Sequence, residues 1–158
     1  MKVLGVNCST HCAFLAVAVD GELGDRHVEY IEAPTLADSS EELASVLEEI
    51  GRVINEVEAD KVVLLKPEGG PTPKKSHAAF VPRIALETIV RLAAVQTQTD
   101  IEVLPRPTLR SRLNLPPKGK LVEHVPLRIP GKIGKNWSEE RQLAALAALA
   151  GEEERNAA

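Results

Sequence analysis

Cys8, His11 and Cys12 are three closely spaced side chains able to bind a metal ion, and the two cysteines could also act as nucleophiles. A structural zinc site is tetrahedral and needs four ligands, and His11 is the only further candidate near the two cysteines. Two cysteines are also too few for a disulfide framework. They flank a short polar stretch between two apolar runs, which suits reduced thiols. We therefore expect neither a zinc ion nor a disulfide here.

Charge is distributed unevenly along the chain, although the net charge is only −4. Residues 1–65 carry a net charge of −9, residues 66–137 one of +8, and residues 138–158 one of −3. Such a basic segment is typical of a face that binds an anion, often nucleic acid, although solvated surface side chains explain it equally well. The candidate nucleic-acid contacts are Lys74, Lys75, Arg83, Arg106, Arg110, Arg112, Lys118, Lys120, Arg128, Lys132 and Lys135.

Aromatic residues make up only 3% of the chain. The core should therefore be built from aliphatic side chains, and recognition of nucleic acid by base stacking would have few platforms. Trp137 is the single aromatic residue at the end of the basic segment. It either stacks on a base or packs beneath the last helix.

The first 65 residues predict an antiparallel meander followed by a crossover to a buried strand. Three apolar runs separated by turn residues predict the strands of the meander, at 2–6, 13–19 and 27–31. A turn is expected at 20–24, and apolar residues then recur at helical spacing over 41–58. The run 61–65 fits a strand buried on both faces, and we expect it beside the first strand.

The remaining residues predict more helices than strands. We expect a helix over about 79–94 and then a strand at 101–104. A brief helix follows, which Thr108 caps and which reaches Leu113. The last helix runs from 139 to about 150 and is capped by Ser138. Residues 114–136 hold four prolines and four lysines with little periodicity and are expected to form a long basic loop. Residues 151–158 are expected to be a flexible tail.

Length and hydropathy point to one cytoplasmic domain over residues 1–150. A chain of 158 residues is an ordinary size for a single core. No apolar run approaches the roughly 18–20 residues of a membrane span, and the N-terminus lacks the features of a signal peptide. We therefore expect no membrane partner.

The expected order of elements, β-β-β-α-β-α-β-α, resembles the ribonuclease H-like superfamily and, within it, the resolvase-type (RuvC-like) proteins. Three local patterns carry the resemblance: KVLGVNCST at 2–10, ADKVVLLK at 59–66 and WSEERQLAALA at 137–147. The chain is also similar to an uncharacterised bacterial family of this fold. The resemblance implies an α/β fold in which a mixed sheet, of three antiparallel strands plus parallel strands, is flanked by helices.

The resemblance also implies where a nuclease of this fold would hold its metal ions. Active members use clustered carboxylates to bind two divalent ions about 4 Å apart, which activate water and stabilise the leaving oxygen. The equivalent positions in this chain are Asn7, Lys66, Glu139 and Gln142. Only one of them is a carboxylate, so the resemblance implies a degenerate site in which Lys66 could pair with Glu139 in place of a metal ion.

Each of these residues also has an ordinary local explanation. Asn7 is a turn-capping residue, Lys66 a strand-end lysine that reaches solvent, and Glu139 a first-turn helix acid favoured by the helix dipole. Glu68 lies two residues beyond Lys66 and is a further candidate acid, although its proline and glycine neighbours argue against a continuing strand.

Three functions follow from this interpretation. The first is a catalytically degenerate resolvase-like domain that binds nucleic acid or a protein partner and needs no cofactor. The second is a magnesium- or manganese-dependent endonuclease with a rearranged set of carboxylates, such as Glu68 and Glu139 with Asn7. The third is a nucleotide or small-molecule module, because residues 5–10 resemble the phosphate-contacting hairpin of sugar-kinase and actin-like folds. The sequence is also compatible with a homodimer.

Overall fold

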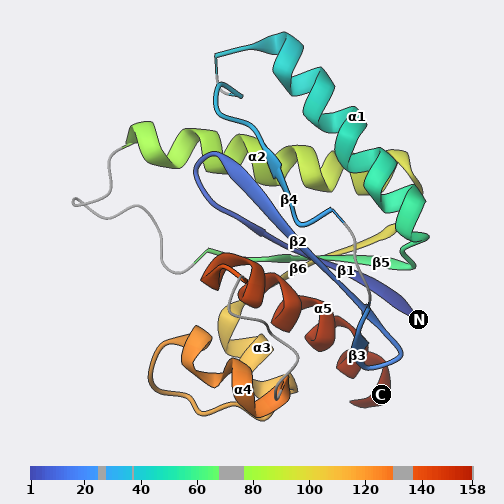
Figure 1. Cartoon of the computed structure of the whole chain (residues 1–158), viewed down its shortest axis with the longest axis vertical. Helices are drawn as coiled ribbons and strands as arrows, with labels where there is room; N and C mark the ends of the chain where they lie inside the picture. The colour runs from blue at the N-terminus through green and yellow to red at the C-terminus, as the bar shows by residue number, and fades with distance from the viewer. Residues whose placement is uncertain (25–27, 37, 68–76, 130–136, 158) are drawn as a thin grey trace.

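The computed structural model describes residues 1–24, 28–36, 38–67, 77–129 and 137–157. These residues form a six-stranded mixed sheet with helices on both faces (Figure 1). The strands are β1 (Lys2–Cys8), β2 (Cys12–Val19), β3 (Glu22–Leu23), β4 (Tyr30–Glu32), β5 (Lys61–Leu65) and β6 (Asp100–Leu104). The helices are α1 (Ser40–Val57), α2 (His77–Gln96), α3 (Arg106–Arg112), the 3-10 helix η1 (Leu121–His124), α4 (Val125–Arg128) and α5 (Glu139–Ala157).

The strand order is β3-β2-β1-β5-β6, and β4 also pairs with β2. β2 runs antiparallel to β1, β3 and β4, whereas β1, β5 and β6 run parallel to one another. This confirms the expected mixed sheet and the position of residues 61–65 beside the first strand. The carboxyl ends of the three parallel strands consequently lie at one edge of the sheet, on the left in Figure 1. We call it the carboxyl edge.

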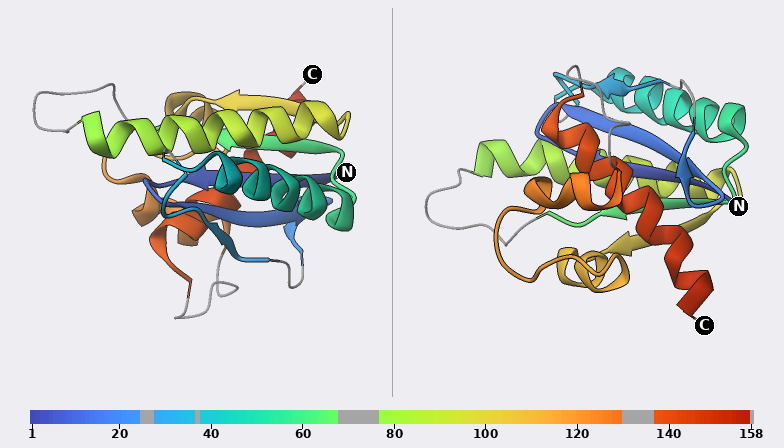
Figure 2. Two further views of the ribbon diagram at one scale, coloured as in Figure 1. Left: turned by 90° about the horizontal axis from the view of Figure 1, so that it is seen from above. Right: turned by 60° about the horizontal axis from the view of Figure 1, so that its bottom comes forward.

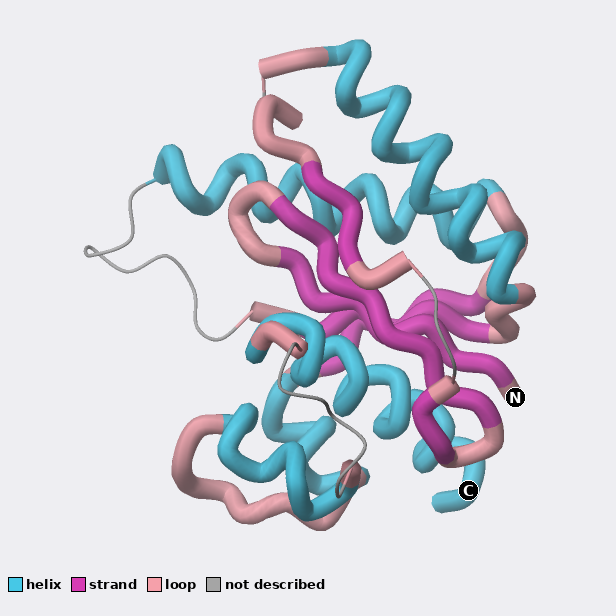
Figure 3. Tube along the Cα trace, viewed as in Figure 1, coloured by secondary structure: helices cyan, strands magenta, loops and turns pink. Residues whose placement is uncertain are grey.

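Two apolar layers hold the sheet between its helices. One face, with Leu4, Val6 and Leu64, packs against α1 and α2. The opposite face, with Val3 and Val63, packs against α3, α4 and α5. Figure 2 shows the two helical layers on opposite sides of the sheet, and Figure 3 shows the strand trace running between them. The architecture is therefore α/β/α, with an aliphatic core as the composition predicts.

The crossover helix α1 has the ends that its sequence predicts. The Ser39 side chain accepts a hydrogen bond from the Glu42 amide, which satisfies one of the free N–H groups of the first turn. At the other end Glu58 adopts a left-handed conformation, and its amide bonds back to the last turn. The expected helix over 41–58 is confirmed to within a residue at each end.

The turn after β2 is tighter than expected. We predicted a turn over 20–24, but only Asp20 and Gly21 form it, with φ of 51° and 83°, and the chain returns to strand at once. Positive φ at both central residues is typical of a two-residue hairpin turn. The strand predicted at 27–31 is observed as β4, three residues later at its start, and residues 25–27 lie outside the described residues.

Two predictions for the second half of the chain were wrong. Thr108 does not cap α3, because Pro105 precedes the helix and Pro107 stands in its first turn, where a missing N–H costs nothing. Within the predicted loop, the described residues 114–129 contain η1 and α4, and Leu121, Val125 and Ile129 are buried there, while 130–136 lie outside the described residues. This i, i+4 spacing contains Pro126 and follows a stretch with two prolines and two lysines at 116–120, which hid its helical period.

The last helix is longer than predicted. Ser138 caps α5 through a hydrogen bond from the Arg141 amide, as expected, but the helix continues past Ala150 to Ala157. Gly151 and Glu152 are buried, and the Glu152 carboxylate accepts a hydrogen bond from the Gly21 amide. The first part of the predicted tail is therefore packed against the β2–β3 turn. In the described part of the chain, no helix has the length and hydropathy needed to cross a membrane.

Helix α5 lies in direct contact with the backbone of β1 and with a side chain of β5. A β-carbon placed on Gly5 would overlap the Ala144 carbonyl oxygen and lie 2.7 Å from the Ala148 amide nitrogen. One placed on Gly151 would lie 2.5 Å from the side chain of Val63. Two glycines on facing surfaces therefore set the distance between the helix and the sheet.

Replacing Gly5 with alanine should destabilise the protein severely. The added methyl group meets helix backbone, which cannot rotate away, so we expect a loss of about 3 kcal/mol or more in the free energy of unfolding. Gly51→Ala in α1 is the matched control, because its added β-carbon has only an ordinary contact at 3.8 Å. It should raise stability by about 0.5–1 kcal/mol. Urea unfolding monitored by circular dichroism measures both, and a Gly5→Ala loss below about 1 kcal/mol would contradict the close packing.

Candidate nucleic-acid interface

The carboxyl edge gathers the ends of three strands and the first turn of α5. Asn7 lies near the end of β1, Lys66 directly follows β5, and Pro105 directly follows β6. Helix α5 begins at the same edge, because the Asn7 side chain donates a hydrogen bond to the Glu140 carbonyl oxygen. Ligands of open α/β sheets commonly bind outside the carboxyl ends of parallel strands.

Asn7 is buried and only partly satisfied. It is 4% exposed, and its Nδ2 lies 3.1 Å from the Glu140 carbonyl oxygen. Its Oδ1 has no hydrogen-bond donor among the described residues. The asparagine therefore ties β1 to the first turn of α5, rather than facing an open site as a metal ligand would.

The structure does not bring Lys66 to Asn7. The parallel register pairs Val6 with Leu64, so Lys66 is level with Cys8, one residue beyond Asn7. Successive side chains alternate between the faces of a sheet, and Cys8 packs on the side of α1 and α2. The expected ion pair between Lys66 and Glu139 is not formed, because Asn7 and α5 lie on the other face.

The two candidate site residues on α5, Glu139 and Gln142, have different surroundings. Glu139 is exposed in the first turn, where the helix dipole favours an acid. Gln142 donates from Nε2 to the Trp137 carbonyl oxygen at 3.0 Å, which closes the start of its own helix. Glu68 lies outside the described residues.

The side chains at these four positions are not suited to bind a pair of divalent metal ions. Magnesium needs carboxylate oxygens and retained water molecules, whereas the buried Asn7 presents an amide already bound to a carbonyl oxygen. Within the described ranges, no group of three or more histidine, cysteine, aspartate or glutamate side chains could hold a metal ion. No catalytic step through metal ions follows from this arrangement.

The two cysteines are free thiols. Burial raises the pKa of the Cys8 thiol, and burial together with Glu32 and Glu140 raises the pKa of Cys12 to about 11. Both groups are therefore protonated at neutral pH and are poor nucleophiles.

Several of the predicted nucleic-acid contacts are engaged in ion pairs within the chain. Arg83 pairs with Glu87 at 3.1 Å, and Arg128 pairs with Glu153 at 2.8 Å. Lys74, Lys75, Lys132 and Lys135 lie outside the described residues. A basic sequence segment thus overstates the positive charge that is available on the surface.

Arg112 has a structural role. Its guanidinium donates two hydrogen bonds to the Glu102 carboxylate, which also pairs with Lys61 at 2.8 Å. Burial raises the pKa of Glu102, but the hydrogen bonds from Arg112 and Lys61 outweigh it and hold the pKa below its usual range. This bridge joins β5, β6 and α3, and so fixes the position of α3 at the carboxyl edge.

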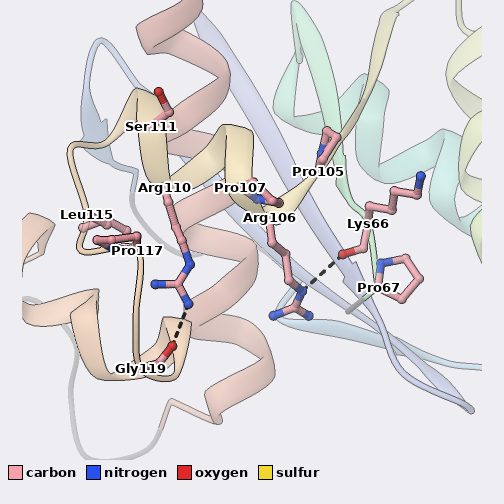
Figure 4. A pocket seen from close by; sticks show the side chains of 10 residues that line it. All are labelled: Lys66, Pro67, Pro105, Arg106, Pro107, Arg110, Ser111, Leu115, Pro117 and Gly119. Carbon is pink, nitrogen blue, oxygen red and sulfur yellow. Dashed lines mark hydrogen bonds between the residues drawn. The ribbon is translucent and has the colours of Figure 1, made fainter. Parts of the chain in front are cut away.

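The remaining predicted arginines line a cavity of about 640 Å³ at the ends of β5 and β6. We call it the cationic cleft; its walls are Lys66, Pro67, Pro105, Arg106, Pro107, Arg110, Ser111, Leu115, Pro117 and Gly119. Figure 4 shows the guanidinium groups of Arg106 and Arg110 extending from α3 in the same direction, while the Lys66 ammonium extends away from them on the far wall.

Hydrogen bonds hold both arginines in place. Arg106 Nε donates to the Lys66 carbonyl oxygen at 3.2 Å, and Arg110 donates to the Gly119 carbonyl oxygen at 2.7 Å (Figure 4). Arg110 also donates to the Pro116 carbonyl oxygen at 2.5 Å. Carbonyl oxygens orient these guanidinium groups. The cleft therefore presents fixed positive charge between rigid proline walls.

Exposed lysines extend the positive charge around the cleft. Lys118 and Lys120 flank the cleft residue Gly119, and neither they nor Lys66 has an ion pair with any described carboxylate. One acid is close, because a β-carbon on Gly119 would lie 3.2 Å from a Glu123 carboxylate oxygen. Sequence reasoning found the arginines but missed the cleft and its proline walls. Pro105 after β6 and Pro67 after Lys66 were the available signal.

Trp137 packs into the protein and is not a free stacking platform. It is half-buried against the apolar layer that contains α5. The guanidinium of Arg141 lies 3.6 Å from the centroid of its ring, and Arg141 also pairs with Glu29 at 3.2 Å. Burial lowers the pKa of Arg141, against the opposing effect of Glu29. Of the two alternatives for Trp137, packing beneath the last helix is the one observed.

Solved structures of RuvC from Thermus thermophilus align with nearly the whole chain. RuvC in complex with a Holliday junction substrate aligns with a TM-score of 0.75 and 16% identity, over 99% of this chain and 96% of that chain. A second Thermus thermophilus RuvC structure gives the same TM-score, with 15% identity over the same shares. The chain therefore has the RuvC-like form of the ribonuclease H-like fold, as the sequence predicts.

A weaker alignment is to a hexokinase of the ROK type from Thermus thermophilus. It has a TM-score of 0.39 and 18% identity, covers 72% of this chain and 38% of that chain, and is too distant to bear on the fold. No protein-family model and no curated protein sequence matches the chain.

Restoring a carboxylate at Asn7 should destabilise the protein rather than create a metal site. In Asn7→Asp the buried charge faces the Glu140 carbonyl oxygen, so we expect a loss of roughly 3–5 kcal/mol at neutral pH. Burial raises the pKa of the introduced carboxyl above its unfolded value near 4. The loss should therefore disappear below about pH 4, where a protonated carboxyl can donate to that oxygen, and grow as the pH rises.

Thermal unfolding between pH 3.5 and 7.5 measures this effect, with Asn7→Ala as the control that introduces no titrating group. A loss in Asn7→Asp that does not vary with pH would contradict the proposed environment. So would stabilisation of the variant by millimolar magnesium.

Proposed function

We propose that this chain binds the phosphate backbone of double-stranded nucleic acid at the cationic cleft and does not cleave it by two-metal hydrolysis. The observation that carries the proposal is the cleft itself, which holds two fixed guanidinium groups at the carboxyl edge of the parallel strands. Guanidinium groups match the geometry of phosphate oxygens, and such contacts are independent of base sequence.

The distribution of charge supports a local rather than a global attraction. The net charge of −4 repels a polyanion at long range, so binding must rely on one face. Helix α1 carries acids, whereas Arg106, Arg110, Lys118 and Lys120 surround the cleft. We therefore place the nucleic acid on the side of α3.

The scarcity of aromatic side chains favours a duplex over a single strand. Proteins that bind single strands stack the bases on aromatic rings. No aromatic residue lines the cleft, and Trp137 is packed beneath Arg141. Thermus thermophilus RuvC, whose fold this chain shares, is the protein solved with a Holliday junction. A branched duplex is therefore the first substrate to try.

Binding to duplex DNA should weaken steeply with salt. If about four phosphates are neutralised, log affinity should fall against log salt with a slope near −3 to −4. The combined change Lys118→Ala and Lys120→Ala should reduce the slope by about two, because Arg106 and Arg110 keep their contacts, and Glu123→Gln should strengthen binding. Arg52→Ala is the matched control, since Arg52 is an exposed cation on α1 paired with Glu56.

Fluorescence anisotropy with a labelled duplex and a labelled four-way junction, at about 50–200 mM salt, measures these slopes. The proposal fails if neither DNA binds at tens of micromolar protein in about 50 mM salt, where non-specific sites are normally occupied. It also fails if Arg52→Ala weakens binding as much as the double change. Tight competition by a nucleotide or inorganic phosphate would favour the small-molecule alternative, for which the cleft is also of ordinary size.

The protein should not cleave DNA in the presence of metal ions. Asn7, Lys66 and Gln142 supply no negative charge, so we expect intact plasmid and intact four-way junction after incubation with millimolar magnesium or manganese. Gel electrophoresis of the products is the measurement, with Glu139→Ala as the comparison. Metal-dependent cleavage by the wild type that is lost in Glu139→Ala would establish the endonuclease alternative instead.

A further inference from the structure

Residues 116–120 form a turn between α3 and η1 at one wall of the cationic cleft, and we call it the cleft turn. Arg110 of α3 donates hydrogen bonds to two of its carbonyl oxygens, those of Pro116 and Gly119, and Figure 4 shows the second of these bonds. One guanidinium that bonds two carbonyl oxygens of the same turn holds both at a fixed separation. The cleft turn is therefore clamped to α3.

Two residues of η1 hold two further carbonyl oxygens of the cleft turn. His124 Nε2 lies 2.8 Å from the Lys118 carbonyl oxygen, and because a carbonyl oxygen only accepts, the ring nitrogen is the donor. The Glu123 amide donates to the Lys120 carbonyl oxygen at 3.1 Å. Together with the two bonds from Arg110, these contacts engage four of the five carbonyl oxygens of the cleft turn.

The backbone N–H groups of the cleft turn are in the opposite situation. Its first two residues are prolines and have no N–H, so Lys118, Gly119 and Lys120 carry all of its backbone donors. In the part of the chain that the structure describes, none of these three N–H groups has an acceptor, and all three residues are exposed. The cleft turn thus directs its acceptors toward the protein and leaves three successive donors available to a ligand.

The conformation of Gly119 suits this arrangement. Its φ is 85°, in the left-handed region that favours glycine. Successive N–H groups in such a turn form a concavity that binds anions. A β-carbon on Gly119 would lie 3.2 Å from a Glu123 carboxylate oxygen and 3.4 Å from His124 Nε2. Glycine therefore allows both the backbone conformation and the close approach of the histidine that holds the turn.

We propose that the three successive N–H groups of the cleft turn bind a phosphate group, and that His124 is a positioning residue for this site. A phosphodiester offers oxygen acceptors and no donors, which matches a turn that presents only donors. The side chains of Lys118 and Lys120 supply the opposite charge on either side of Gly119. The proposal rests on the proposed function for the source of the phosphate, which is the backbone of the bound nucleic acid.

Binding by the main chain gives a signal at three particular amides. In isotope-labelled protein, inorganic phosphate should move the amide proton resonances of Lys118, Gly119 and Lys120 downfield, because each N–H gains a charged acceptor. Sodium chloride at the same ionic strength is the control and should not. A short DNA duplex should move the same three resonances. Absence of a shift at these amides with both phosphate and duplex would overturn the proposal.

The same titrations separate this site from the proposed function. A duplex that binds and shifts the amides of Arg106 and Arg110, but not those of the cleft turn, would leave nucleic-acid binding intact and contradict the phosphate site. Shifts of the cleft turn with inorganic phosphate, in a protein that binds no duplex, would support the phosphate site and contradict nucleic-acid binding.

Substitutions distinguish the main chain from the lysine side chains. Lys118→Ala combined with Lys120→Ala keeps all three N–H groups, so the shifts should persist but need more phosphate. His124→Ala removes the donor to the Lys118 carbonyl oxygen and should abolish the shifts and weaken duplex binding about tenfold, because the turn is no longer preorganised. His124→Gln keeps a side-chain N–H donor and should restore most of the binding.

Arg52→Ala on α1 is the matched control and should change neither the shifts nor the affinity. Circular dichroism shows whether each variant folds. The proposal is wrong if the shifts disappear in the double lysine change and persist in His124→Ala, since the lysine side chains alone would then account for binding. It is also wrong if His124→Gln binds duplex as weakly as His124→Ala.

Discussion

Helix α5 lies against β1 at backbone distance because Gly5 and Gly151 carry no side chain on the facing surfaces. This contact fixes the first turn of α5 at the end of β1, where the Asn7 side chain reaches the Glu140 carbonyl oxygen. Two consequences follow from the short distance. The apolar layer of alanines and leucines in α5 closes over the sheet, and the space beside Asn7 is occupied by protein atoms. The same packing therefore completes the RuvC-like fold and buries the Asn7 amide at this position. Among the described residues, no carboxylate cluster lies there.

The second constraint is the pairing of several basic side chains with carboxylates of the same chain. Glu102 joins Lys61 and Arg112, and through them β5, β6 and α3. Because this bridge holds α3 at the end of β6, Arg106 and Arg110 are presented side by side with carbonyl oxygens as their partners. Fixed guanidinium groups lose little freedom when they bind a phosphate, which is why we assign binding to the cleft rather than to the basic segment as a whole.

Sequence periodicity predicted the elements that are strongly patterned. The helix behind Ser39, the buried strand at 61–65 and the cap at Ser138 are all observed, because each combines a regular apolar period with a local end signal. It failed at Leu121, Val125 and Ile129, whose helical spacing contains Pro126 and follows a stretch rich in prolines and lysines. It also failed where tertiary contact decides the outcome. The face occupied by Lys66 depends on strand register, and the extension of α5 depends on a hydrogen bond between Glu152 and Gly21, which are distant in sequence.

The most direct test of nucleic-acid binding at the cleft is a titration of the isotope-labelled protein with a short DNA duplex, followed by amide chemical shifts. No metal ion is added. The account predicts that the largest changes occur at the amides of Lys66, Arg106, Arg110, Leu115 and Gly119, which line one cavity but come from separate parts of the sequence. Changes confined to α1 or to the outer face of α2, or an unchanged spectrum with excess duplex at low salt, would contradict it.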